Sequence, residues 1–145
     1  MITPAALLYA AGGAIFCVLG LVHAAYVWMD LRHPRRLVPG DPALIAAMAR
    51  SRVRLAGDAT DMWRAWIGFN LSHSLGALLV GAMAIAWPAL AAGHAALAWL
   101  PAAVAAVYLL IGLRYWFHVP NAGIAVATLA FAAAALSSTA SRTWC

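Results

Sequence analysis

The chain has 145 residues, 66% of them hydrophobic and 9% charged, with a formal net charge of +5. Soluble domains carry about 25% charged residues, so this composition excludes an ordinary soluble domain. All nine cations are arginine and all four acids are aspartate, which excludes a Schiff-base lysine and a catalytic glutamate. The arginines lie beside apolar segments without a recognition motif, so we expect no nucleic-acid partner and a lipid bilayer instead.

The first predicted element is a membrane span over about residues 4–29. Its apolar run exceeds the roughly 7–15 residues of a signal-peptide core, and no positive segment precedes it. The polar segment 30–61 follows. In it, Gly40-Asp41-Pro42 predicts a helix start with Asp41 as N-cap, and a basic amphipathic helix from Ala43 to about Leu55. Such a helix beside spans is typical of the membrane surface.

Three further spans are predicted, over about residues 62–87, 95–116 and 122–137. No charged residue occurs from Ala65 to Leu113, a stretch long enough for two passes of about 20 residues each. Asp58, Thr60 or Asp61 is available as the N-cap of the second span. The predicted turns are Trp87-Pro88 with Gly93-His94, and Val119-Pro120-Asn121. Pro101 predicts either a kink in the third span or its beginning.

The sequence therefore predicts one all-α domain, a polytopic four-transmembrane-helix bundle with the amphipathic helix in its first cytoplasmic loop. Its orientation follows from the arginines. Eight of the nine flank the first and third loops, and only Arg142 lies at the other side, so the positive-inside rule places those loops in the cytoplasm and both termini outside. Tryptophans are expected at both interfaces. They are Trp28, Trp63, Trp66 and Trp116 on the cytoplasmic side, and Trp87, Trp99 and Trp144 on the other.

Polar side chains recur at helical spacing on every span. His23, Tyr26 and Asp30 share one face of the first span, because residues three, four and seven apart lie on one side of a helix. The other three stripes are Trp66, Asn70, His73 and Ser74; Tyr108, Gly112 and Tyr115, followed by His118; and Asn121 with Thr128.

The predicted topology brings these stripes to the cytoplasmic half of the bundle. At about 1.5 Å per residue, His23 lies about 10 Å inward from Asp30 and His73 about 13 Å inward from Arg64. We therefore predict a pocket with His23 and His73 as catalytic groups, because imidazole transfers protons near neutral pH. The predicted ligand is an isoprenoid, quinone or other lipid-like molecule. The predicted ligand-binding residues are Tyr26, Trp66, Asn70, Ser74, Tyr108, Tyr115, His118 and Asn121.

Several alternatives remain open. Polar side chains also hydrogen-bond between helices simply to hold a bundle together, which would make the protein a non-catalytic subunit or scaffold, and a homo-oligomer is compatible with either reading. Two histidines at one depth could ligate a b-type haem, although we predict no cofactor and no metal site. His23, Asp30 and His33 could supply part of a metal site. Asp30 and Asp61 are expected to cap helices or to pair with Arg32 and Arg64.

Two strings, Trp66-Ile-Gly-Phe-Asn-Leu-Ser-His-Ser-Leu-Gly76 and Arg114-Tyr-Trp-Phe-His-Val-Pro-Asn-Ala-Gly-Ile124, resemble a family of small four-helix bacterial integral membrane proteins. The resemblance covers about two-thirds of the chain. It implies the four-span topology, and it supplies no activity. We expect a multi-pass protein of the cell inner membrane. Sterol-isomerase-like bundles offer a looser architectural analogy, but they rely on intramembrane acids including glutamate, which this chain lacks, so no catalytic residue is carried over.

Overall fold

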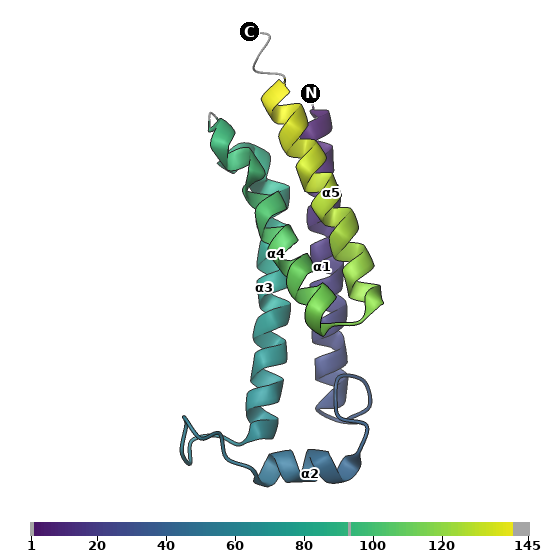
Figure 1. The fold of residues 1–145 in the computed structure, drawn as a ribbon, viewed down its shortest axis with the longest axis vertical. Helices are drawn as coiled ribbons and strands as arrows, with labels where there is room; N and C mark the ends of the chain where they lie inside the picture. Colours follow the sequence, from purple (N-terminus) through teal and green to yellow (C-terminus); the bar gives the residue numbers. More distant parts are fainter. Residues whose placement is uncertain (1, 93, 141–145) are drawn as a thin grey trace. The chain divides into compact units, whose positions relative to one another are not determined.

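The computed structural model describes residues 2–92 and 94–140. These residues form helices and no strand, apart from an isolated antiparallel bridge between Arg52 and Asp61. The elements in chain order are α1 (Pro4–Asp30), α2 (Pro42–Arg50), α3 (Met62–Leu90), the 3-10 helix η1 (Ala95–Trp99), α4 (Leu100–Tyr115) and α5 (His118–Ala140) (Figure 1). The all-α prediction is confirmed.

Four segments are long and apolar enough to cross a membrane: α1, α3, η1 continued by α4, and α5. A span needs about 20 predominantly apolar residues, and the four contain 27, 29, 21 and 22. The chain is therefore a multi-pass membrane protein. The turn residue Gly93, and Arg142, Trp144 and Cys145 at the far end, lie outside the described residues.

Two predicted turns are placed differently. Pro88 lies inside α3, which continues to Leu90. Helix α5 begins at His118, so the predicted turn at Val119-Pro120-Asn121 is wrong and the chain turns at residues 116–117 instead. Proline fits the first turn of a helix because the N–H that it lacks has no partner there. The same rule explains Pro101, which lies in the first turn of α4 after η1, so that the α-helix begins there.

The chain divides into two compact units, and the helices α1 and α3 contribute to both. The first, here the core unit, contains the described residues of 2–19 and 77–140. The second, here the loop unit, contains residues 20–76. We describe each unit by itself.

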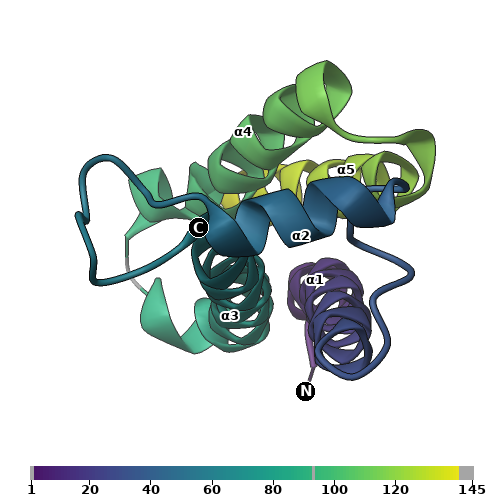
Figure 2. The same cartoon turned by 90° about the horizontal axis from the view of Figure 1, so that it is seen from below.

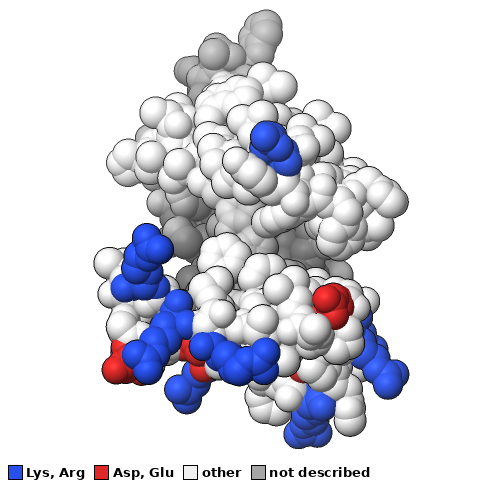
Figure 3. Space-filling view, turned by 60° about the horizontal axis from the view of Figure 1, so that its bottom comes forward, with Lys and Arg blue, Asp and Glu red and all other residues white. Residues whose placement is uncertain are grey.

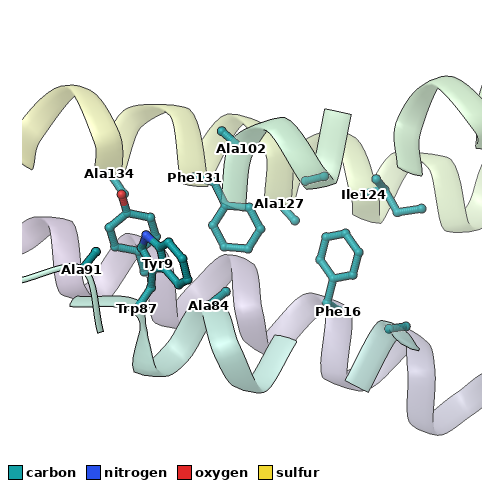
Figure 4. Close-up of a cluster of buried hydrophobic side chains, with 12 residues drawn as sticks. Tyr9, Phe16, Ala84, Trp87, Ala91, Ala102, Ile124, Ala127, Phe131 and Ala134 are labelled. Atoms are coloured by element: carbon teal, nitrogen blue, oxygen red, sulfur yellow. The ribbon is translucent and has the colours of Figure 1, made fainter. Parts of the chain in front are cut away.

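Aromatic side chains form the centre of the core unit (Figure 4). Phe131 of α5 lies between Tyr9 and Phe16 of α1, with ring centroids 6.3 and 6.2 Å apart. Tyr108 of α4 meets Phe16 edge to face at 5.5 Å. Rings at these distances gain about 0.5–1.5 kcal/mol beyond the area they bury. Alanines fill the space around them, so the helices approach closely.

Within the core unit, α1 and α3 approach each other closely at two glycines. A Cβ atom on Gly13 would lie 2.6 Å from the carbonyl oxygen of Gly81, and one on Gly81 would lie 2.6 Å from that of Gly13. Neither atom can move aside, since both belong to helix backbones. Small residues at such contacts are what allows helices to pack tightly in lipid, where burial of apolar surface gives no driving force.

The loop unit contains the polar segment, in which α2 runs across the ends of α1 and α3 (Figures 1 and 2). As predicted, Asp41 caps α2 by accepting from Ala43 N at 2.8 Å. Asp61, one of the three candidate caps, accepts from Arg64 N at 2.8 Å. The amphipathic helix is confirmed, but it ends at Arg50 rather than near Leu55.

Helix α2 ends early because the chain then forms a short hairpin. Met62 N donates to Ser51 O at 2.8 Å, and Gly57 takes a φ of +57° at the turn. Glycine adopts this left-handed conformation without the steric penalty of a side chain. The loop unit contains all four aspartates and every described arginine except Arg114, and charged side chains gather over it in Figure 3.

Candidate functional site

An imidazole and an amide meet inside the loop unit. His23 Nε2 lies 3.0 Å from Asn70 Oδ1, which joins α1 to α3. The Asn70 amide nitrogen donates to Trp66 O at 2.8 Å, so Oδ1 is the atom that faces the histidine. A carbonyl oxygen only accepts, and Nε2 of His23 therefore carries the proton. Nδ1 is then the acceptor of the neutral ring.

A second imidazole lies against the first. The rings of His23 and His73 meet edge to face with centroids 5.2 Å apart. Phe69 stacks on the other side of His73 at 6.5 Å. Both histidines are half-buried, whereas Phe69 is exposed. The structure thus brings together the two residues expected as catalytic, and it places an aromatic ring beside them on the outer surface of the helices.

Asn70 and Ser74 form the buried side of the cluster. They are 6% and 2% exposed, and Ser74 Oγ donates to Asn70 O at 2.9 Å. Trp66 is part of the same helix face, but its indole Nε1 donates to Leu37 O at 2.8 Å in the polar segment. Trp66 therefore fastens the loop to α3. A narrow cleft too tight for a water molecule lies between Trp66, Asn70 and Asp30.

Asp30 has a role that the sequence did not indicate. Its carboxylate is 1% exposed and accepts from the backbone N–H groups of Arg35, Arg36 and Leu37 at 2.9, 3.0 and 2.7 Å. We expected Asp30 to cap a helix or to pair with Arg32. It instead folds the following loop back over the end of α1, because these N–H groups belong to irregular backbone that needs a buried acceptor.

Tyr26 lies on the exposed side of this loop. It is 41% exposed, and the guanidinium carbon of Arg36 lies 5.4 Å from its ring centroid. Arg32 lies in the same way over Trp28, at 5.8 Å. Arginine over an aromatic ring is stabilised by the ring quadrupole. The loop unit therefore presents two cationic groups over aromatic rings, and Asp30 holds the backbone of one of them, Arg36.

The remaining predicted ligand-binding residues belong to the core unit. Tyr108 packs against Phe16 as described above. Tyr115 is 73% exposed with Arg114 over its ring at 5.2 Å, and His118 is exposed at the start of α5. Asn121 Oδ1 is buried, and among the described residues no hydrogen-bond partner reaches it. It packs against Gly112, where any Cβ would collide with it.

The histidine pair does not fit a b-type haem as it stands. Two imidazoles that ligate one iron hold the macrocycle between them, whereas these rings touch and His23 Nε2 donates to Asn70. The described residues also contain no group of three or more His, Cys, Asp or Glu side chains placed to hold a metal ion. His23, Asp30 and His33 are therefore not brought together as a ligand set.

Sequence reasoning missed one further feature. The core unit contains a cavity of about 480 Å³ beside Tyr9 and Trp87. Its only sequence signal is the tryptophan, proline and histidine near the end of the second span.

Three comparisons with known proteins gave no match. No protein-family model matches the chain, and no curated protein and no solved structure matches it either. Function is therefore argued from the geometry of the two units alone.

Proposed function

We propose that the protein binds, and through its histidines transforms, a lipid-like molecule whose polar head reaches the His23–His73 pair. The observation that supports this most directly is the contact of the two half-buried imidazoles at 5.2 Å within membrane-spanning helices. Polar side chains within spans are rare and usually mark a functional site. One imidazole at this depth could be a structural residue, whereas two in contact bring two proton-transferring groups to one place.

The hydrogen bonds of the cluster define which ring nitrogens are available to the polar head of such a molecule. Since His23 Nε2 is held by Asn70, Nδ1 remains as an acceptor of the neutral ring. A hydroxyl group could donate to that atom and a carbonyl could accept from a protonated imidazole. Imidazole gives and takes protons near neutral pH, so proton transfer to or from an oxygen of the ligand is the chemistry that this pair could supply.

The tail of the molecule would remain in the bilayer. The cleft beside Asn70 is too narrow for a hydrocarbon chain, and Phe69 and Leu71 are exposed on the outer surface of α3. In a membrane that surface faces lipid. A molecule with its head at the histidines and its tail against these side chains needs no enclosed pocket. Isoprenoids, quinones and other lipid-like molecules have this form.

We infer that the loop unit faces the cytoplasm. Residues 31–61 contain six of the nine arginines, and Arg64 follows at the start of α3. Short loops rich in arginine remain on the cytoplasmic side. With four crossings, this orientation puts both termini on the opposite side of the membrane. In a bacterium, that membrane is the inner membrane.

A scaffold is the second candidate, and a specific observation favours it. Both groups of the Asn70 amide already have partners, His23 and Trp66, and Ser74 is satisfied by Asn70 O. Hydrogen bonds of this kind hold helices together at about 0.6–2 kcal/mol each. If that is their whole role, the histidines bind no ligand and the protein is a non-catalytic membrane subunit.

Native mass spectrometry of protein extracted with its surrounding lipid distinguishes these candidates. The proposal predicts one bound lipid-like molecule per chain that survives removal of bulk lipid. A chain that loses all adducts together with bulk lipid would favour the scaffold. An absorbance spectrum of the same sample tests the haem alternative, for which a Soret band would be required.

A further inference from the structure

The core unit contains a cavity of about 480 Å³ at the ends of its helices. The first turn of α1, the last turns of α3 and α5, and the segment around η1 surround it. Sites for small molecules typically have about 300–1,000 Å³. The cavity is therefore large enough for a ring with a short side chain, and it lies among residues 2–19 and 77–140, separate from the histidine pair.

Two aromatic side chains in its lining are held by hydrogen bonds. Tyr9 Oη donates to Ala98 O at 2.6 Å, and Trp87 Nε1 donates to Leu97 O at 3.0 Å. Both rings are buried, and Tyr9 stacks on Phe131 (Figure 4). Because the carbonyl groups of η1 hold both polar ends, the rings are in place before any ligand arrives. Such preorganisation lowers the entropy lost on binding.

Two further side chains of the lining, Ser137 and His94, provide hydrogen-bond acceptors. Ser137 donates its hydroxyl proton to Ala133 O at 2.9 Å, so its oxygen can still accept a hydrogen bond. His94 Nδ1 lies 3.2 Å from Ala92 O and must donate to it, so Nε2 is the acceptor of the neutral ring. A molecule that brings a hydroxyl donor would match this lining.

Charge narrows the class of ligand further. Among the residues that the structure describes, no charged side chain lines the cavity, and all four aspartates of the chain lie in the loop unit. A cation held among apolar rings without a carboxylate would lose its hydration without compensation. An anion would meet oxygen lone pairs. The lining therefore suits an uncharged molecule.

We propose that this cavity is a second binding site, which takes an uncharged amphiphile with a ring and a hydroxyl group, such as a phenol or an alcohol of sterol type. The ring lies against Tyr9 and Trp87, and the hydroxyl donates to His94 Nε2 or to Ser137 Oγ. The lining residues are at the ends of spans, where amphipathic rings concentrate in a bilayer. This site is independent of the function proposed for His23 and His73.

Two matched probes test the proposal. 4-Hexylphenol carries a hydroxyl donor, whereas 4-hexylanisole has the same ring and chain without one. Calorimetric titration of the full chain in detergent micelles, with protein-free micelles as the blank, should show saturable one-to-one binding of the phenol. The anisole should bind at least fivefold more weakly. Equal affinities, or heat that never saturates, would overturn the proposal, because the first removes the role of the acceptors and the second indicates partition only.

Variants locate the binding. Ala6 is half-buried and lines the cavity, so Ala6→Phe should fill it and reduce phenol affinity at least tenfold. Ala11→Phe, at an exposed position of the same helix outside the lining, should leave the affinity unchanged. If Ala6→Phe is not monodisperse, Ser137→Phe, at an exposed lining position, decides the question. Normal binding by a folded filling variant contradicts the assignment, as does loss of binding in His73→Ala.

Discussion

Asn70 Oδ1 of α3 accepts a hydrogen bond from His23 Nε2 of α1 at 3.0 Å, across 47 residues of sequence. This bond fixes the tautomer of one imidazole, and the ring that it orients touches the second, His73, edge to face. The amide of Asn70 thus orients the ring against which His73 packs.

The first prediction concerns the strength of that bond. Asn70→Ala and His23→Ala should each lower the free energy of unfolding in mixed micelles, with a coupling of about 0.6–2 kcal/mol between them in a double-mutant cycle. Ser72→Ala is the matched control, since Ser72 is exposed and bonds only to Phe69 O one turn back. Additive single effects would mean that the two side chains do not bond in the membrane.

The second prediction concerns Asp30. Asp30→Ala removes a buried acceptor of three backbone N–H groups, and hydrogen bonds to a charged group contribute about 1.5–3 kcal/mol each. Trypsin should then cleave after Arg35 and Arg36 at least tenfold faster than in the parent chain. Asp58→Ala, which removes an exposed ion pair with Arg52, should leave that rate unchanged. Equal rates in all three proteins would contradict the role assigned to Asp30.

The third prediction concerns the glycine contact of α1 and α3. Gly13→Ala places a methyl group 2.6 Å from a backbone oxygen, so it should lower the free energy of unfolding by about 1–3 kcal/mol. Gly68→Ala is the control, because nothing lies within 4 Å of its added Cβ. Alanine favours a helix over glycine by about 1 kcal/mol, so Gly68→Ala should be neutral or stabilising. The same loss at both positions would argue against the close crossing.

The fourth prediction concerns orientation. Leu55 is 99% exposed in the hairpin between α2 and α3. In a background with Cys17 and Cys145 replaced by serine, Leu55→Cys should react with a membrane-impermeant maleimide only from the cytoplasmic side. Ala92→Cys, exposed between α3 and η1, should react only from the opposite side. Reversed labelling would invalidate the arginine argument.

The sequence predicted the parts of this structure that follow from local periodicity. Four long apolar stretches required four helices, and Asp41 and Asp61 occupied positions that favour helix N-caps. The start of α5 was misplaced because Val119-Pro120 fits a turn and a first helical turn equally well from local preference alone. In the structure, where Val119 and Pro120 lie in the first turn of α5, Asn121 packs against Gly112.

Contacts between distant segments were harder to predict. Helical spacing and equal depth were enough to place His23 near His73. Each belongs to a row of polar side chains, and exposing such a row to lipid would cost free energy. No spacing rule links Asp30 to Arg35, Arg36 and Leu37, since those three contribute only their backbone. The cavity beside Tyr9 is formed by the ends of several helices far apart in sequence, and its polar atoms belong to isolated side chains that form no motif.

The central claim is that the His23–His73 pair holds a lipid-like molecule, and the most direct test is to count that molecule in purified variants. We predict that native mass spectrometry finds about one bound molecule per chain in the parent protein and in His33→Ala, a loop histidine outside the pair. His73→Ala should lose it while keeping its helix content and monodispersity. Undiminished binding in a folded His73→Ala protein, or lower thermal stability as its only defect, would contradict the claim and leave the polar cluster as a contact that holds two helices together.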